Sequence, residues 1–237
     1  MTNSNVAIGF PVTHWKPPPF PHKESLEGSY CRLEALNAKH HTSELFDAFA
    51  QDADGLDWVY LPYGPFDTPE TLREWLQEVA AKSDPMFYTV IGPQGKAIGI
   101  ASYLRITPAS GSIEVGHIHF SPRLQQTPAA TQAMYLMMKH AFDSGYRRYE
   151  WKCDALNERS RRAALRLVLS FEGIFRQATV YKCRNRDTAW YGAIDQEWPQ
   201  LKAAFEAWLD PANFDDNGMQ RKSLSELTAP ILVSVDP

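Results

Sequence analysis

The sequence contains few cysteines and no long apolar run. The three cysteines, Cys31, Cys153 and Cys183, are widely spaced and form neither a CxxC pair nor a Cys/His metal spacing. A fold that depends on disulfides is therefore excluded, and a reducing compartment is indicated. No stretch approaches the roughly 18 apolar residues of a membrane span, and residues 1–20 lack the basic start and apolar run of a secretory signal. We expect a cytoplasmic protein without a membrane partner.

An excess of charge of one sign is also lacking. The 24 Lys and Arg residues face 28 Asp and Glu residues, which gives a formal net charge of -4. This balance supplies no general attraction to nucleic acid, so nucleic-acid binding is excluded as the main activity. With 44% hydrophobic residues, a chain of 237 residues can bury a sizeable core. We expect one globular domain with appendages.

The prolines are unevenly distributed, and five of the 17 fall between Pro11 and Pro21. A proline-rich segment favours extended backbone. We therefore expect residues 1–28 to form an extended arm that drapes over the body, with a plain flexible tail as the alternative. The globular domain is expected at 29–210, followed by an irregular tail at 211–237.

Hydrophobic periodicity predicts an alternation of strands and helices. Helix starts are indicated by Asn37 and by Thr68 with Pro69 in the first helical position. Three further helices are expected at Thr127–Ser144, Asn157–Ser170 and Gln196–Leu209, and strands at 29–36, 86–91, 97–106, 112–120, 147–153, 174–183 and 189–195. The central three strands form an antiparallel meander. This order predicts an α/β (α+β) fold with a mixed sheet, helices on both faces, and a ligand crevice where the strand order changes.

One helix start offers several backbone donors. Thr127 caps this helix and Pro128 follows it, so the amides of Ala129, Ala130 and Thr131 point out of the helix start beside small side chains. Such amides bind anions. An ordinary capped helix is the alternative.

From this point the sequence resembles a known family. Five stretches span most of residues 29–210: LPYGPF (61–66), GSIEVGHIHF (111–120), LQQTPAATQAM (124–134), GYRRYEWKCDALN (145–157) and the segment 171–199. In this order they resemble the GNAT superfamily of acyl-CoA-dependent N-acetyltransferases, in the branch of the ribosomal-protein alanine acetyltransferases.

The resemblance implies a sheet that splays between its fourth and fifth strands, with acetyl-CoA in the opening. Arg123 matches the first residue of the family's phosphate loop, whereas Gln126 and Pro128 stand at its two glycine positions. The cofactor-binding residues implied are His119, Phe120, Arg123, Thr127, Ala129, Ala130, Thr131, Asn157 and Ser160.

Two family positions that assist the reaction differ in this chain. Relatives carry a Tyr seven residues after the Asn that corresponds to Asn157, where this chain has Ala164, and Gly-Phe where it has Val168-Leu169. The resemblance therefore names no Tyr general acid. Water or Ser160 is left to protonate the departing thiolate.

The attacking amine must lose a proton to a nearby carboxylate or imidazole. Glu114, which matches a Glu common in this branch, and His117 are the two candidate bases. A structural ion pair is the alternative role for Glu114. His117 and His119 lie two residues apart on a strand, but no third metal ligand has a useful spacing, so no metal is expected.

Together these features predict an N-acetyltransferase that acts on a primary amine by direct attack. A small molecule or amino acid is slightly favoured over a protein N-terminus, and a homodimer is allowed. The rings of Trp58, Tyr60, Tyr63 and Phe66 line an acceptor pocket or pack into the core, and Arg184–Asp187 is expected to pair internally with acidic residues. A catalytically weak GNAT-fold module that binds an acyl-CoA or another ligand is the alternative.

Overall fold

A single mixed sheet organises the chain. In the computed structural model, which describes residues 7–236, eight strands follow the order β1-β2-β3-β4-β5-β6-β8-β7. Only β5 and β6 are parallel, and every other neighbouring pair is antiparallel. The strands are β1 (Leu26–Glu27), β2 (Arg32–Ala35), β3 (Met86–Ile91), β4 (Ala97–Thr107), β5 (Ser112–Phe120), β6 (Arg148–Asp154), β7 (Ser170–Tyr181) and β8 (Arg184–Ile194).

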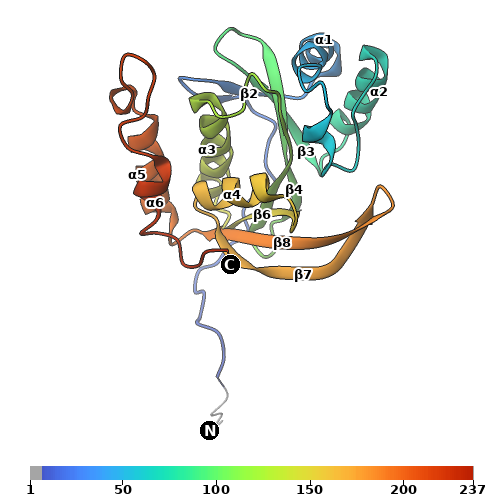
Figure 1. Ribbon diagram of the computed structural model, residues 1–237. Helices are drawn as coiled ribbons and strands as arrows, with labels where there is room; N and C mark the ends of the chain where they lie inside the picture. Colours follow the sequence, from blue (N-terminus) through green and yellow to red (C-terminus); the bar gives the residue numbers. More distant parts are fainter. Residues whose placement is uncertain (1–6, 237) are drawn as a thin grey trace.

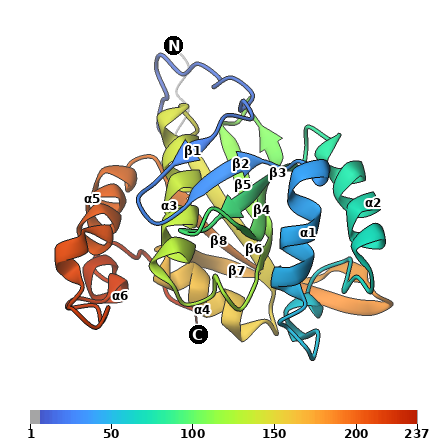
Figure 2. The same ribbon diagram turned by 90° about the horizontal axis from the view of Figure 1, so that it is seen from above.

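Helices cover both faces of this sheet. Figure 1 shows α1 and α2 on one side and α3 and α4 on the other, and Figure 2 shows α5 and α6 outside α3. A separate hydrophobic cluster fills the space on each face. The predicted mixed sheet with helices on both faces is confirmed. The helices are α1 (Ala38–Phe49), α2 (Pro69–Ala80), α3 (Pro128–Asp143), α4 (Glu158–Arg166), α5 (Trp198–Leu209) and α6 (Leu224–Thr228).

The predicted capping residues open their helices. The Asn37 side chain accepts hydrogen bonds from two first-turn amides of α1, and Thr68 forms a reciprocal capping box with Thr71 at the start of α2. Thr127 caps α3 by accepting a bond from the amide of Ala130. Each bond satisfies a donor that the helix itself cannot pair.

Helix α4 ends earlier than predicted. It stops at Arg166 rather than Ser170, because Val168 takes a left-handed conformation with φ of 67° and the amide of Leu169 returns to the carbonyl of Ala164. This arrangement is a helix-terminating motif that usually carries glycine at the left-handed position. The chain released by this early stop begins β7 at Ser170, four residues before the predicted start of that strand.

Strands β7 and β8 form a long hairpin that extends beyond the sheet and under α1 and α2 (Figure 1). Strand β8 begins at Arg184, five residues before the predicted start. The turn consists of Lys182 and Cys183, which both have positive φ. The sequence interpretation placed this turn at Arg184–Asp187, because a tight hairpin turn of this handedness usually contains Asn or Gly and Lys182-Cys183 contains neither. Residues 184–187 instead belong to β8.

Both predicted end segments contain residues that contact the body of the protein. Residues 1–6 of the predicted arm lie outside the described residues, and residues 7–12 are exposed. Farther along, the carbonyl of Pro19 accepts a bond from the hydroxyl of Tyr146, and the last predicted arm residues contribute β1. The C-terminal segment is not wholly irregular, because Ser223 and Glu226 form a capping box that begins α6.

Asp236, the last described residue, contacts α4 and β8. The Asp236 carboxylate pairs with the guanidinium of Arg161 and accepts a bond from the hydroxyl of Tyr191. The Asp236 side chain is only 7% exposed.

Within residues 7–236, no helix is long and apolar enough to cross a membrane.

Removing this carboxylate should destabilise the protein. We expect Asp236→Ala to lower the free energy of unfolding by about 1 to 3 kcal/mol, because Arg161 and Tyr191 lose a charged hydrogen-bond partner. Chemical denaturation measures the change. The exposed Asp216→Ala is the matched control, and an equal effect of both substitutions would show that the tail is not held by Asp236.

Candidate active site

The sheet opens between its two parallel strands. Strands β5 and β6 pair only over the register from Ser112 with Arg148 to Val115 with Trp151. Beyond this rung, residues 116–120 of β5 pair only with β4, and residues 152–154 of β6 pair only with β8. The opening implied by the resemblance is present at the predicted strands. Along these residues, β5 and β6 are not paired with each other.

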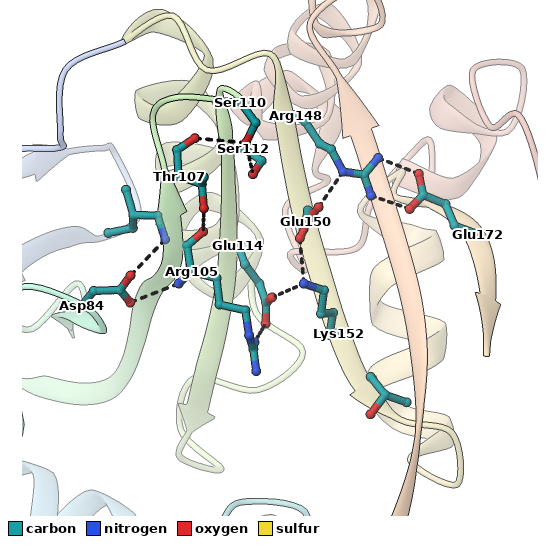
Figure 3. Close-up of polar contacts among 12 residues, drawn as sticks. Asp84, Arg105, Thr107, Ser110, Ser112, Glu114, Arg148, Glu150, Lys152 and Glu172 are labelled. Atoms are coloured by element: carbon teal, nitrogen blue, oxygen red, sulfur yellow. Dashed lines mark hydrogen bonds and ion pairs between the residues drawn. The ribbon is translucent and has the colours of Figure 1, made fainter. Parts of the chain in front are cut away.

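A ladder of charged side chains crosses the sheet at the start of this opening (Figure 3). Lys152 lies in the middle, with Nζ 2.8 Å from Oε2 of Glu114 and 2.8 Å from Oε2 of Glu150. The same Nζ lies 3.7 Å from the ring centroid of Trp190. The ladder runs in the order Arg105, Glu114, Lys152, Glu150, Arg148 and Glu172.

Both carboxylate oxygens of Glu114 are engaged in this ladder. Arg105 lies 2.6 Å from Oε1 and Lys152 contacts Oε2, and the Glu114 side chain is only 3% exposed. Burial raises the pKa of Glu114, while Lys152 and Arg105 act in the opposite direction. The geometry is that of the buried ion pair given above as the alternative role for this residue.

His117 is differently placed. It has φ of 49° at an irregularity in the pairing of β4 with β5, and its Nδ1 lies 3.1 Å from the hydroxyl of Tyr63. Burial, followed by the charges of Arg105 and Arg186, lowers the pKa of His117 to about 4. The imidazole is therefore neutral at pH 7. No described residue is hydrogen-bonded to its Nε2.

His119 lies on the same side of β5 but deeper. Its ring stacks on Trp58 with centroids 3.6 Å apart and packs edge-on against Phe49. Burial lowers its pKa to about 3, and its buried Nε2 has no hydrogen-bond partner among the described residues. Across residues 7–236, no group of three His, Cys, Asp or Glu residues is arranged to hold a metal ion.

The predicted phosphate loop keeps only some of its donors. The Ala130 amide donates to the Thr127 side chain and the Thr131 amide to the Thr127 carbonyl, at 3.2 and 3.4 Å. Within residues 7–236 the amides of Gln126, Thr127 and Ala129 have no acceptor. Gln126 takes a left-handed φ of 59° at the position where the family pattern has glycine.

A cation that sequence reasoning missed lies at this helix start. The guanidinium of Arg166, from the end of α4, donates to the hydroxyl of Thr131 at 3.0 Å. Arg166 is separated from Thr131 by 35 residues, so only the fold brings the two together. Arg123 is exposed on the same loop.

Asn157 and Ser160 lie at the start of α4 as predicted. The Asn157 side chain accepts a bond from the Ser160 amide at 3.1 Å, which makes it the helix cap. The Ser160 hydroxyl accepts a bond from the indole nitrogen of Trp151 at 3.0 Å. Trp151 is the last residue of β6 that pairs with β5. The backbone amide of Asn157 donates to the carbonyl of Asp154, whereas its side-chain nitrogen Nδ2 has no acceptor among the described residues.

The loop between α1 and α2 bridges the opening. Asp57 accepts a bond from Gln125 of the phosphate loop, and the hydroxyl of Tyr60 donates to the carbonyl of Leu156 beyond β6. Lys182, at the tip of the hairpin, donates to the carbonyl of Trp58 at 2.9 Å. The loop therefore contacts both sides of the opening and the hairpin.

Between this loop and the hairpin lies an open groove of about 660 Å³. Of the four rings expected to form an acceptor pocket, Trp58 and Tyr60 line the groove. Tyr63 and Phe66 instead pack against Trp75. The lining consists of Gly55, Trp58, Val59, Tyr60, Pro65, Asp154, Leu156, Tyr181, Lys182, Arg184 and Asn185.

Comparison with known proteins assigns the family. The model of the acetyltransferase (GNAT) domain matches residues 32–168. The chain belongs to the GNAT acetyltransferase family. It is accordingly an N-acetyltransferase, and acetyl-CoA is the co-substrate of this family. Among curated proteins, none matches this chain.

Solved structures agree with this assignment. A GCN5-related N-acetyltransferase from Brucella melitensis is 45% identical, with 92% of this chain and 100% of that chain covered and a TM-score of 0.90. A GNAT-family structure from Chromobacterium violaceum ATCC 12472 is 39% identical, with coverage of 83% and 99% and a TM-score of 0.76. RimL, a ribosomal L7/L12 alpha-N-protein acetyltransferase, shares the fold at 21% identity, coverage of 72% and 94% and a TM-score of 0.62.

The buried imidazole makes the stability of this acetyltransferase depend on pH. Folding lowers the pKa of His117 from 6.5 to about 4. Between these two pH values His117 is protonated in the unfolded chain but neutral in the folded protein. The stabilisation is therefore complete above pH 6.5 and is lost as the pH falls towards 4. When the pH is lowered from 6.5 to 4, the free energy of unfolding should fall by about 2 kcal/mol less in His117→Gln than in the wild type, because glutamine takes up no proton. Denaturation at several pH values, with the exposed His14→Gln as control, measures this difference, and parallel pH profiles would contradict it.

Proposed function

We propose that the protein transfers the acetyl group of acetyl-CoA to a primary amine, which attacks the thioester directly. The opening between β5 and β6 carries this proposal, because the neutral imidazole of His117 lies on its β5 edge and unpaired amides begin the helix that follows this strand. No cysteine or serine lies beside an activating base at this opening in residues 7–236, so a covalent enzyme intermediate is not part of the proposal.

The residues around the opening fit acetyl-CoA. Unpaired amides at Gln126, Thr127 and Ala129, with Arg166 close by, offer donors and positive charge to a pyrophosphate. Pro128 supplies no amide, so the loop has one donor fewer than the family pattern. Bound acetyl-CoA supplies an activated acetyl group and a thiolate leaving group. The residues proposed to hold it are His119, Phe120, Arg123, Thr127, Ala129, Ala130, Thr131, Asn157 and Ser160.

Of the two candidate bases, His117 is better placed to accept the proton. A proton acceptor needs an available lone pair within reach of the amine. Glu114 accepts a hydrogen bond from Arg105 at Oε1, and its Oε2, which has no hydrogen-bond partner, lies 2.8 Å from the Lys152 ammonium. A carboxylate between two cations is a weak base, whereas His117 is neutral and its Nε2 has no partner among the described residues. In the tautomer whose Nδ1–H donates to the Tyr63 oxygen, Nε2 carries the lone pair, and this is the tautomer proposed to act as base.

Ser160 is the proposed proton donor to the thiolate, with water as its substitute. Its oxygen accepts the indole N–H of Trp151, and its hydroxyl also contacts the Cys153 side chain, whose pKa it acts to lower. The Ser160 O–H is therefore a donor that already faces a sulfur atom at this edge of the opening. Ser160 also begins α4 beside the unpaired part of β6. Ala164, the family's Tyr position, is completely buried and supplies no such group.

Two matched substitutions separate the candidate bases. Thiol release from acetyl-CoA in the presence of a panel of primary amines measures turnover. We expect His117→Gln to lower kcat by roughly a hundredfold or more. Glu114→Gln and Glu150→Gln each remove one carboxylate from Lys152, so both should lower kcat by similar, smaller factors.

Other outcomes would reject parts of this proposal. A large loss in Glu114→Gln alone would make Glu114 the base instead of His117. An absence of thiol release with every amine, although the protein binds CoA, would favour the ligand-binding module given above as the alternative.

A further inference from the structure

The hairpin carries two arginines without acidic partners. Among residues 7–236, no carboxylate lies within 4.0 Å of the guanidinium of Arg184 or of Arg186, so the internal pairing expected for this stretch is wrong. The nearby Asp187 is engaged otherwise, because its Oδ1 accepts bonds from the Gln177 amide and the Asn185 side chain. By contrast, Arg105 is paired with a carboxylate.

Both arginines belong to one face of β8. They are two residues apart on the strand, and side chains at that spacing lie on the same face. Arg184 lines the groove. Arg186 is partly buried, with Nε donating to Thr188 at 3.1 Å and its guanidinium 5.9 Å from the ring centroid of Tyr181, another groove residue.

The charge of Arg186 acts on both edges of the opening. It lowers the pKa of His117 on β5 and also acts to lower that of Cys153 on β6. The groove that Arg184 lines also reaches both edges of the opening, because its lining includes Asp154 of β6 and Trp58, which stacks on His119 of β5. A partly buried guanidinium with only one side-chain hydrogen bond keeps most of its donors available for an anion.

We propose that the acceptor is a primary amine that also carries a carboxylate, and that Arg186, assisted by Arg184, binds this carboxylate. The inference rests on the proposed function, because it names the substrate class of the same site. Guanidinium and carboxylate form two parallel hydrogen bonds, which fixes the orientation of the acceptor as well as its affinity. Arg186 and Arg184 are then specificity-determining residues.

The bound carboxylate also acts on the base. Because the positive charge of Arg186 depresses the pKa of His117, a carboxylate that neutralises this charge raises the pKa of His117 again. His117 then becomes a stronger proton acceptor when the correct acceptor is present. A neutral amine of the same size lacks this effect.

The test compares matched amines in the thiol-release assay. One arm uses β-alanine against β-alaninamide, and a second uses the C-terminally amidated peptides Ala-Glu-Glu-NH2 and Ala-Gln-Gln-NH2, so that only one member of each pair carries a carboxylate. The two arms separate a free amino acid from an acidic peptide as the source of the carboxylate. We expect the carboxylate-bearing member of at least one pair to have a kcat/KM roughly tenfold or more higher. Arg186→Gln should abolish this preference, Arg186→Lys should restore part of it, and Arg184→Gln should weaken it.

The exposed Arg221→Gln is the control for the loss of a surface cation and should keep the full preference. Equal kcat/KM within both pairs would overturn the inference while leaving the acetyltransfer reaction intact. An equal loss for both members of a pair in Arg186→Gln would also overturn it, because Arg186 would then act on the reaction or the fold. No turnover with any amine would instead reject the proposed function.

Discussion

The site depends on the point at which two parallel strands stop pairing. After the pair Val115 and Trp151, β5 and β6 no longer pair with each other. From there β5 pairs only with β4, and β6 pairs only with β8. Unpaired backbone groups inside a protein cost free energy unless another partner satisfies them. The divergence therefore creates a strip of donors and acceptors suited to an extended polar ligand, in the middle of an otherwise continuous sheet.

The charged ladder lies at the start of this divergence. Glu114 on β5 and Lys152 on β6 join the two strands by an ion pair just where their backbone pairing ends. Charges that are removed from water are tolerated when each has a partner, and Lys152 has two carboxylates and an aromatic ring. Glu114, which the family resemblance marks as a candidate base, is thus part of a structural network. The neighbouring His117 instead has a ring nitrogen, Nε2, without a hydrogen-bond partner among the described residues.

Local signals in the sequence predicted much of the fold. The caps at Asn37, Thr68 and Thr127, the meander of β3 to β5 and the opening between β5 and β6 all follow from patterns within short segments or from the family motifs. The predicted end of α4 was wrong because Val168 takes a left-handed conformation. A glycine at this position would have indicated the end of the helix, and a valine does not. Contacts between distant segments, such as Tyr63 with His117 and Arg166 with Thr131, were beyond local patterns, because only the folded chain brings these residues together.

Backbone hydrogen exchange with and without CoA tests the central role of the opening most directly. Bound CoA should slow exchange in residues 116–120 and 152–154 at the edges of the opening and in the amides of Gln126, Thr127 and Ala129. Exchange in β3, which lies within the paired part of the sheet, should not change. Protection confined to the groove or to other segments, with the edges of the opening unaffected, would contradict the account.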